Sequence, residues 1–167
     1  MNSEWKEIKL GKVCSFEKKT IHPKKGILYN LYSLPSYDNN KEPETIDGED
    51  IKSNKYQIKK GDILYNKLNV EFKRIWNMNH ELLPNSICST EFIPIQSIKL
   101  DNNFLYYLLN SYYFTKYMSI RSTGTSKSHQ RINQKDLENI KIKIPSLTKQ
   151  KSIGKILQNL DSKIEIN

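Results

Sequence analysis

The stretch GTSKSHQRI at residues 124–132 opens the part of the sequence that decides the fold. It is a glycine-opened, hydroxyl-rich basic loop. Asn133 after it is a suitable N-cap for a short helix that runs through Leu137. The run IKIKI at residues 140–144 then alternates apolar and basic side chains, as a half-buried strand does, until Pro145 ends it. A basic loop, a short helix and a strand with its lysines in solvent are therefore expected in this order.

The segment after this strand has the apolar spacing of a helix. Its apolar residues recur in a 4-3-4 rhythm with one more beside them, and they form the expected helix interface: Ile153, Ile156, Leu157, Leu160 and Ile164. Charges and amides fill the other positions, so we expect this stripe to pack on another helix. From Leu147 to Asn167 such a helix is about 30 Å long, which is marginal for a coiled coil that stands alone.

The part of the chain before residue 100 predicts mainly strands. Short apolar or alternating runs bounded by Gly, Pro and Asp indicate strands at residues 5–10, 27–32, 63–65, 75–76 and 87–95. The acidic, turn-rich residues 38–50 predict a surface loop. Asp101 to Asn103 then offers N-cap residues for a helix that should run to about Ile120, with Gly124 beyond its end.

Composition limits the class of protein. The 167 residues carry 27 Lys and Arg against 18 Asp and Glu, and the formal net charge of +9 favours a polyanionic partner. The two cysteines, Cys14 and Cys88, are far apart and form no CxxC or Cys/His cluster, so we expect buried free thiols, no metal site and no cofactor. Neither a signal peptide nor an apolar run of roughly 18 residues is present, which predicts a cytoplasmic protein without a membrane partner.

The basic loop is the first candidate for contact with that partner. No Asp or Glu occurs between Asn102 and Lys135. Lys and Arg with hydroxyl groups suit phosphates, and Arg, Gln, Ser and Thr suit base edges in the major groove. The candidate DNA-binding residues here are Arg121, Thr123, Thr125, Ser126, Lys127, Ser128, His129, Gln130 and Arg131. The alternative is an ordinary solvated surface loop.

A second candidate region lies at residues 65–74. It offers Lys67, Asn69, Lys73 and Arg74 as contacts to phosphate or bases. An exposed hairpin without a ligand is the alternative.

Catalytic signals are weak. Asp62 with Glu71-Phe72-Lys73 loosely matches the D…ExK arrangement of metal-dependent nucleases, a pattern that arises by chance in Lys/Glu-rich chains. The sequence has no glycine-rich cofactor loop, no Asn-Pro-Pro-aromatic motif and no Walker-type loop. We therefore assign no catalytic residue.

The order of these elements resembles the target-recognition domain of type I restriction-modification specificity subunits. The resemblance covers about residues 4–167 and is carried by the 124–131 loop with Lys135-Asp136-Leu137, by the strand end at Ile144-Pro145 and by residues 150–164. Gly61-Asp62-Ile63-Leu64 stands where the family has a similar strand before a variable loop. The resemblance implies a non-catalytic subunit that reads double-stranded DNA, holds methyltransferase (modification) subunits and, through them, the restriction subunit.

The expected fold is mixed α/β (α+β). It has a globular target-recognition domain at residues 1–145, with a twisted, mainly antiparallel sheet and packed helices, and a coiled-coil-like spacer and dimerisation helix at residues 146–167. A full specificity subunit has two such domains and two helices, so a half-subunit, a truncated product or a cut fragment is expected. Two copies that pair as a weak homodimer are one hypothesis. A protein-interaction module with an incidental basic surface is the alternative function, and a stand-alone regulator or RNA binder is a third.

Overall fold

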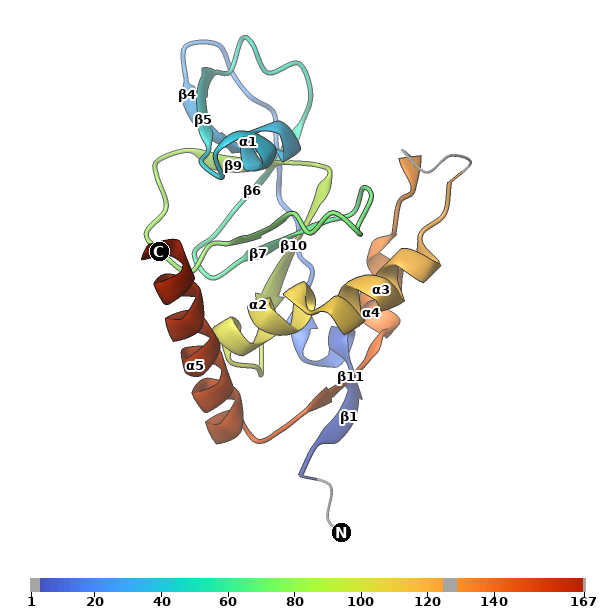
Figure 1. Cartoon of the computed structure of the whole chain (residues 1–167). Helices are drawn as coiled ribbons and strands as arrows, with labels where there is room; N and C mark the ends of the chain where they lie inside the picture. The colour runs from blue at the N-terminus through green and yellow to red at the C-terminus, as the bar shows by residue number, and fades with distance from the viewer. Residues whose placement is uncertain (1–3, 125–128, 167) are drawn as a thin grey trace.

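The frame of the molecule is a set of small, almost entirely antiparallel sheets (Figure 1). The computed structural model describes residues 4–124 and 129–166. One sheet pairs β1 (Lys6–Lys9) with β11 (Lys141–Ile144). A second has the order β2 (Cys14–Ser15), β10 (Phe92–Ser97), β7 (Ile63–Asn66) and β8 (Ile75–Asn77). The third has the order β3 (Thr20–Ile21), β6 (Lys55–Gln57), β9 (Ser86–Ser89), β4 (Leu28–Tyr32) and β5 (Glu44–Asp47), and its β4–β9 pair is parallel.

The helices surround these sheets. They are α1 (Leu34–Asn39), α2 (Asn102–Asn110), α3 (Tyr112–Arg121), α4 (Gln134–Asn139), α5 (Leu147–Ile166) and the short 3-10 helix η1 (Leu10–Lys12). In Figure 1, α1 lies on the five-stranded sheet at the top, and α2 and α3 run across the lower part, with α5 beside α2. This mixed α/β architecture with a long C-terminal helix confirms the expected fold.

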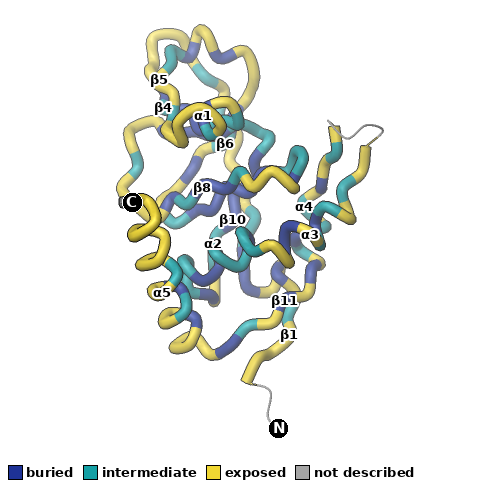
Figure 2. Tube along the Cα trace, viewed as in Figure 1, coloured by how far each residue is buried: buried dark blue, intermediate teal, exposed yellow. Residues whose placement is uncertain are grey.

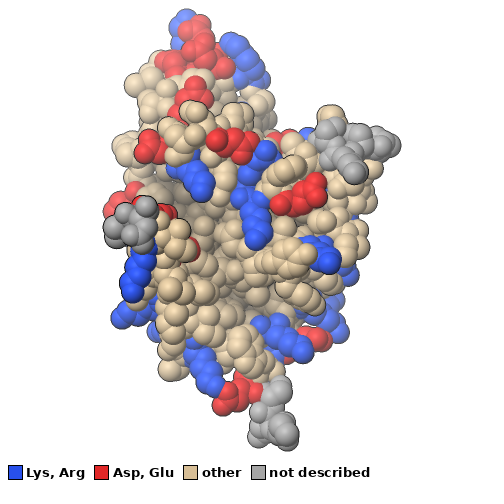
Figure 3. All heavy atoms as spheres, in the orientation of Figure 1, with Lys and Arg blue, Asp and Glu red and all other residues tan. Residues whose placement is uncertain are grey.

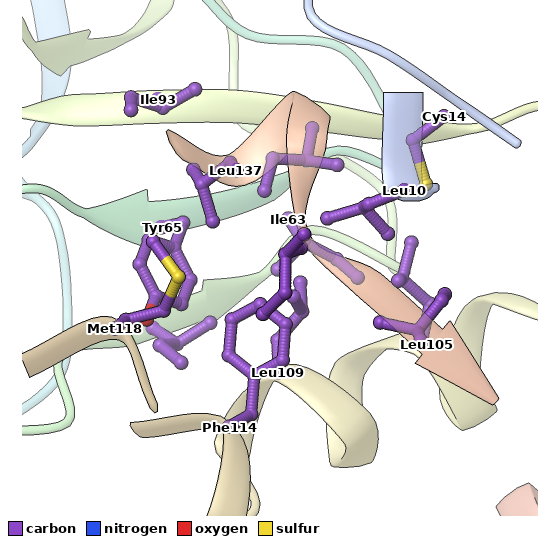
Figure 4. Close-up of a cluster of buried hydrophobic side chains, with 14 of the residues drawn as sticks. Leu10, Cys14, Ile63, Tyr65, Ile93, Leu105, Leu109, Phe114, Met118 and Leu137 are labelled. Atoms are coloured by element: carbon purple, nitrogen blue, oxygen red, sulfur yellow. The ribbon is translucent and has the colours of Figure 1, made fainter. Parts of the chain in front are cut away.

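The largest hydrophobic cluster joins segments from both ends of the chain. Leu10, Ile63, Leu105 and Leu137 have no exposed surface, and they come from η1, β7, α2 and α4 (Figure 4). The ring of Tyr65 packs edge to face on Phe114 of α3, with centroids 5.9 Å apart. Because this core ties α3 and α4 to the central sheet, it fixes the two ends of the loop between them. Figure 2 shows the same division, with a buried centre and exposed outer helices.

Local signals in the sequence are confirmed around α4 and β11. The Asp136 N–H donates to Asn133 Oδ1 at 3.0 Å and the Asn133 N–H to Asp136 Oδ2 at 2.9 Å, a reciprocal capping box. In β11, Ile142 is buried while Lys141 and Lys143 are exposed. The alternation of apolar and basic residues therefore correctly predicted which side of the strand faces the core.

The prediction of one helix up to Ile120 is wrong. Ser111 has an extended backbone with ψ of 147° and separates α2 from α3. Its side chain accepts from the Phe114 N–H at 3.2 Å, so it ends one helix and caps the next. Asp101 caps α2 as expected, accepting from the Phe104 N–H at 2.9 Å.

Two further expectations need correction. The segment 38–50 is not only a loop, because α1 extends into it and β5 forms an edge strand on β4. An edge strand tolerates charged side chains that face solvent, which is why the acidic composition was misleading. The run 87–95 is two strands, β9 and β10, rather than one.

The α5 helix packs on α2 through polar contacts and a glycine. The buried Gln150 side chain accepts from the Asp101 N–H at 3.0 Å and donates to the Pro145 carbonyl at 2.9 Å. A Cβ on Gly154 would lie 2.8 Å from Asp101 Oδ1 and 3.0 Å from the Phe104 nitrogen. At Gly154 the start of α2 therefore lies too close to α5 to leave room for a side chain.

Both cysteines are buried and unpaired. Burial raises the pKa of the Cys14 thiol to about 12, and burial likewise raises the pKa of Cys88. Among residues 4–124 and 129–166, no group of three or more His, Cys, Asp and Glu side chains is arranged to hold a metal ion. No helix in these residues is long and apolar enough to cross a membrane.

Candidate nucleic-acid interface

The fold places the two candidate regions of the sequence side by side. Arg131 forms an antiparallel bridge with Leu68 on one side and with Thr123 on the other. The Asn69 N–H donates to the Gln130 carbonyl at 2.8 Å, and the Gln130 N–H donates to Asn69 Oδ1 at 3.2 Å. The strand-like segment around Arg131 is thus held between the two other segments. We call this surface, residues 67–74 with residues 121–124 and 129–131, the paired-loop surface.

Backbone bonds at the base of the surface are short and regular. The Thr123 N–H donates to the Arg131 carbonyl at 2.8 Å, and the Arg131 N–H returns a bond to Thr123 at 2.9 Å. The Ile132 N–H donates to the Lys67 carbonyl at 3.0 Å. A Cβ on Gly124 would lie 2.6 Å from the His129 carbonyl oxygen, so the two arms of the α3–α4 loop approach this closely only because residue 124 is glycine.

Asn69 has a left-handed backbone conformation, with φ of 50°. Asn tolerates this conformation better than most residues, and its short side chain can bond to nearby backbone. Here its backbone and its side chain both bond to Gln130. Asn69 therefore joins the two loops as well as lying in one of them.

Two of the predicted contact arginines are engaged by carboxylates. Arg131 Nη1 lies 2.9 and 2.7 Å from the two carboxylate oxygens of Glu91. Arg74 donates to both oxygens of Asp38, each at 2.8 Å, and its guanidinium lies 5.5 Å from the centre of the Phe72 ring. Each ion pair fixes the direction of an arginine and also offsets its charge.

The remaining positive charge of the surface comes from lysines and from Arg121. Among the described residues, neither the half-buried Lys67 nor the exposed Lys73 has a carboxylate within ion-pairing distance. Burial, and after it the positive charge of Lys67, lowers the pKa of Lys18. Lys18 therefore lies within electrostatic range of Lys67, and also of the Glu138 carboxylate, which raises its pKa. The Arg121 guanidinium stacks on Tyr117, 3.4 Å from the ring centre.

The other sequence candidates are distributed as follows. Thr123 and His129 are exposed and Gln130 is half-buried, with its side-chain oxygen 3.2 Å from the Ser122 hydroxyl that donates to it. Four predicted contacts lie outside the described residues: Thr125, Ser126, Lys127 and Ser128. Nine of the thirteen candidates lie in the described residues, and backbone contacts directly join the segments that hold five of them: Lys67, Asn69, Thr123, Gln130 and Arg131.

Sequence reasoning did not find Lys18, nor the carboxylates of Glu91 and Asp38 that hold the arginines. Lys18 carries a weak signal, because it lies in the basic pair Lys18-Lys19. The two carboxylates are 40 and 36 residues from their arginines, and no local pattern indicates such partners.

The residues of the loose nuclease pattern have another use. The Asp62 carboxylate accepts from the Lys59 N–H at 2.7 Å and stabilises the turn before β7. Burial raises the pKa of Asp62, whereas Glu71 is exposed in the loop. Asp62 is thus a turn residue.

An acid-free loop, an adjacent basic loop and a rigid support are the features of a nucleic-acid recognition domain. The family model for the type I restriction modification DNA specificity domain matches residues 2–167. The chain therefore belongs to the type I restriction-modification DNA specificity domain family.

Relatives of known class agree with this assignment. The chain is 42% identical over 71 residues to the type I restriction enzyme MjaVIII specificity subunit of Methanocaldococcus jannaschii. The matched segment covers 42% of this chain and 16% of that protein. It is 44% identical over 68 residues to the putative type I restriction enzyme MjaX specificity subunit of the same organism, and this match covers 41% of this chain and 15% of that protein. The chain thus matches only a small part of these relatives.

Solved structures show the same fold. The HsdS subunit from Thermoanaerobacter tengcongensis superposes with a TM-score of 0.78 at 20% identity, over 99% of this chain and 44% of that one. The S subunit of a type I restriction-modification system from M. genitalium gives a TM-score of 0.65 at 16% identity, over 96% of this chain and 40% of that one. The chain spans less than half of each of these subunits.

Proposed function

We propose that this chain is a non-catalytic DNA-recognition unit of a type I specificity subunit. In this role it binds double-stranded DNA in the cytoplasm and reads one half of a split site. It directs modification (methyltransferase) subunits and, through them, the restriction subunit to that site. The observation that carries the proposal is the paired-loop surface, in which hydrogen bonds join two basic loops on a supported frame.

In this proposal the two parts of the chain have separate roles. Residues 1–145 supply the recognition domain, and residues 146–167 supply the spacer and dimerisation helix. In this scheme Lys67, Lys73 and Arg121 meet phosphates, because charge alone suffices there. His129, Gln130 and Asn69 carry groups that can read base edges. The guanidinium groups of Arg74 and Arg131 meet the DNA in orientations that their ion pairs with Asp38 and Glu91 already fix.

A selection from randomised duplexes tests this function. The purified chain is bound at low and at moderate salt, with and without a cognate modification subunit. We expect enrichment of a motif of about three to five base pairs, alone or repeated at a fixed spacing. Salt-sensitive binding without a motif would mean that the chain alone does not read sequence. No binding, even with the modification subunit, would favour a protein-interaction module instead.

The outer face of α5 supports a role in assembly. Ile156, Leu160 and Ile164 are 59, 51 and 72% exposed, while Ile153 and Leu157 are half-buried. The exposed three lie at i, i+4 and i+8 and so share one side of the helix. We propose that this stripe packs on a second helix, either of a second copy in a weak homodimer or of a larger subunit.

Replacing Ile156, Leu160 and Ile164 by serine should abolish that assembly and leave the domain folded. Because these side chains are exposed in the single chain, we expect the thermal midpoint to change by less than about 2 °C. Sedimentation at high concentration, with and without the modification subunit, measures assembly. The matched control replaces Lys151, Lys155 and Asn159, on another side of α5, by serine. Equal assembly of both variants would contradict a role for the stripe, and a wild-type chain that stays monomeric would exclude the homodimer.

A further inference from the structure

A cavity with a volume of about 690 Å³ lies on the molecule away from the paired-loop surface. Residues of α1, β8, α2 and the C-terminal end of α5 line it, together with the loops beside them. Four aromatic side chains from these elements and from β4 line it: Tyr32, Tyr37, Trp76 and Tyr106. We call it the aromatic cavity.

The rings in the wall do not stack on one another. Tyr32 and Tyr37 each meet Trp76 at nearly a right angle, with centroids 4.9 and 5.1 Å apart. Tyr32 and Trp76 are buried, so the half-buried rings of Tyr37 and Tyr106 are the ones whose electron-rich faces a cation can reach. The chain already uses one such face, because Lys41 Nζ lies 5.6 Å from the centre of the Tyr37 ring.

Carboxylates surround the cavity although the protein as a whole is basic. Glu42, Glu81 and Glu165 are among its lining residues, against one lysine, Lys41. Glu81 is paired with Lys60, which lies outside the cavity. Burial raises the pKa of Tyr106 to about 12, with the carboxylates of Asp161 and Glu165 adding to the shift. In Figure 3, acidic side chains gather in the upper part of the molecule, and basic ones dominate the lower part.

Two polar atoms of wall residues are left without a partner. Trp76 Nε1 is a buried donor and Asn77 Oδ1 a buried acceptor, and neither has a hydrogen bond within the described part of the chain. The Trp76 side chain is nearly fully enclosed, with 7% of the residue exposed. A buried polar group without a partner costs free energy.

We propose that the aromatic cavity binds an arginine side chain of a partner protein. The planar guanidinium can stack on a half-buried tyrosine ring of the wall, and its charge suits Glu42 and Glu165. A nucleotide also has a flat ring with donors and acceptors, but its phosphate would meet the carboxylates. The charge of the rim therefore favours a basic peptide, and this inference does not depend on DNA binding by the loops.

Peptide titration followed by NMR tests the proposal on the full chain. The sequence has two tryptophans, so Trp5→Phe assigns the two indole N–H signals. The probes are acetyl-Gly-Arg-Gly-amide, its citrulline analogue, which is neutral and of nearly the same shape, and AMP. We expect the arginine peptide to shift the Trp76 indole and Asn77 side-chain signals saturably, and the citrulline peptide to bind more weakly.

Two double variants test whether the carboxylates that line the cavity attract the arginine peptide. Glu42→Gln with Glu165→Gln should weaken binding of the arginine peptide by about threefold or more. The control, Glu7→Gln with Glu49→Gln, removes the same charge from exposed positions that do not line the cavity and should leave binding unchanged. No shift at Trp76, equal binding of the citrulline peptide, or an equal loss in the control variant would each overturn the proposal. Preferential binding of AMP would also overturn it and identify a nucleotide site.

Discussion

Replacing Lys67 and Lys73 together by glutamate should lower the affinity for short duplex DNA at low salt by about 30- to 100-fold. These lysines lie in the paired-loop surface without a carboxylate partner among the described residues, so their charge is available to phosphates. If each contacts one phosphate, the slope of log affinity against log salt should fall by about 1.8. Fluorescence anisotropy at several salt concentrations measures both quantities.

The control for this experiment is the reversal of Lys151 and Lys155 on α5. It changes the net charge by the same amount at exposed positions that belong to neither loop. We expect a much smaller loss of affinity in this variant. Similar losses in the two variants would show that net charge alone governs binding, and the loops would then lose their assigned role.

Replacing Gly154 by leucine should destabilise the fold by about 2–3 kcal/mol. A Cβ at this position already meets Asp101 Oδ1 at 2.8 Å and the Phe104 nitrogen at 3.0 Å, and both belong to the capped start of α2. Leucine would force α5 away from α2 and disturb the cap. Urea denaturation should show the loss, together with a thermal midpoint lower by roughly 5–10 °C.

Asn159→Leu is the matched control, because it adds the same side chain at an exposed position of the same helix. This variant should keep nearly the stability of the original chain, or gain slightly through the higher helix propensity of leucine. If both variants are equally stable, α5 does not depend on close contact at Gly154. Such a result would make α5 a loosely attached segment.

Features that depend on neighbours in the sequence were predictable. The Asn133 cap, the alternation of Ile142 with its flanking lysines and the cap at Asp101 follow from residue type and spacing within one turn or strand. The break at Ser111 was missed, because the apolar spacing continues across it. A serine gives no strong sign of whether it lies within a helix or caps one.

Features that depend on distant pairing were not predictable. The sequence singled out both basic loops, but nothing in it shows that Leu68 and Arg131 pair across more than sixty intervening residues. The same holds for Arg131 with Glu91 and for Arg74 with Asp38. Gly154 appears in the sequence only as a glycine in a helix, and the reason for it lies in α2.

The hydrogen bonds between the two loops also restrict how this surface can change. Because Asn69 bonds to Gln130 and Leu68 bridges to Arg131, a new sequence in one loop has to fit the backbone of the other. Substitutions in the two loops therefore have to be compatible with each other, although long stretches of chain separate the loops. A graft intended to transfer DNA preference to another scaffold needs both loops, with the strands and helices that hold their ends.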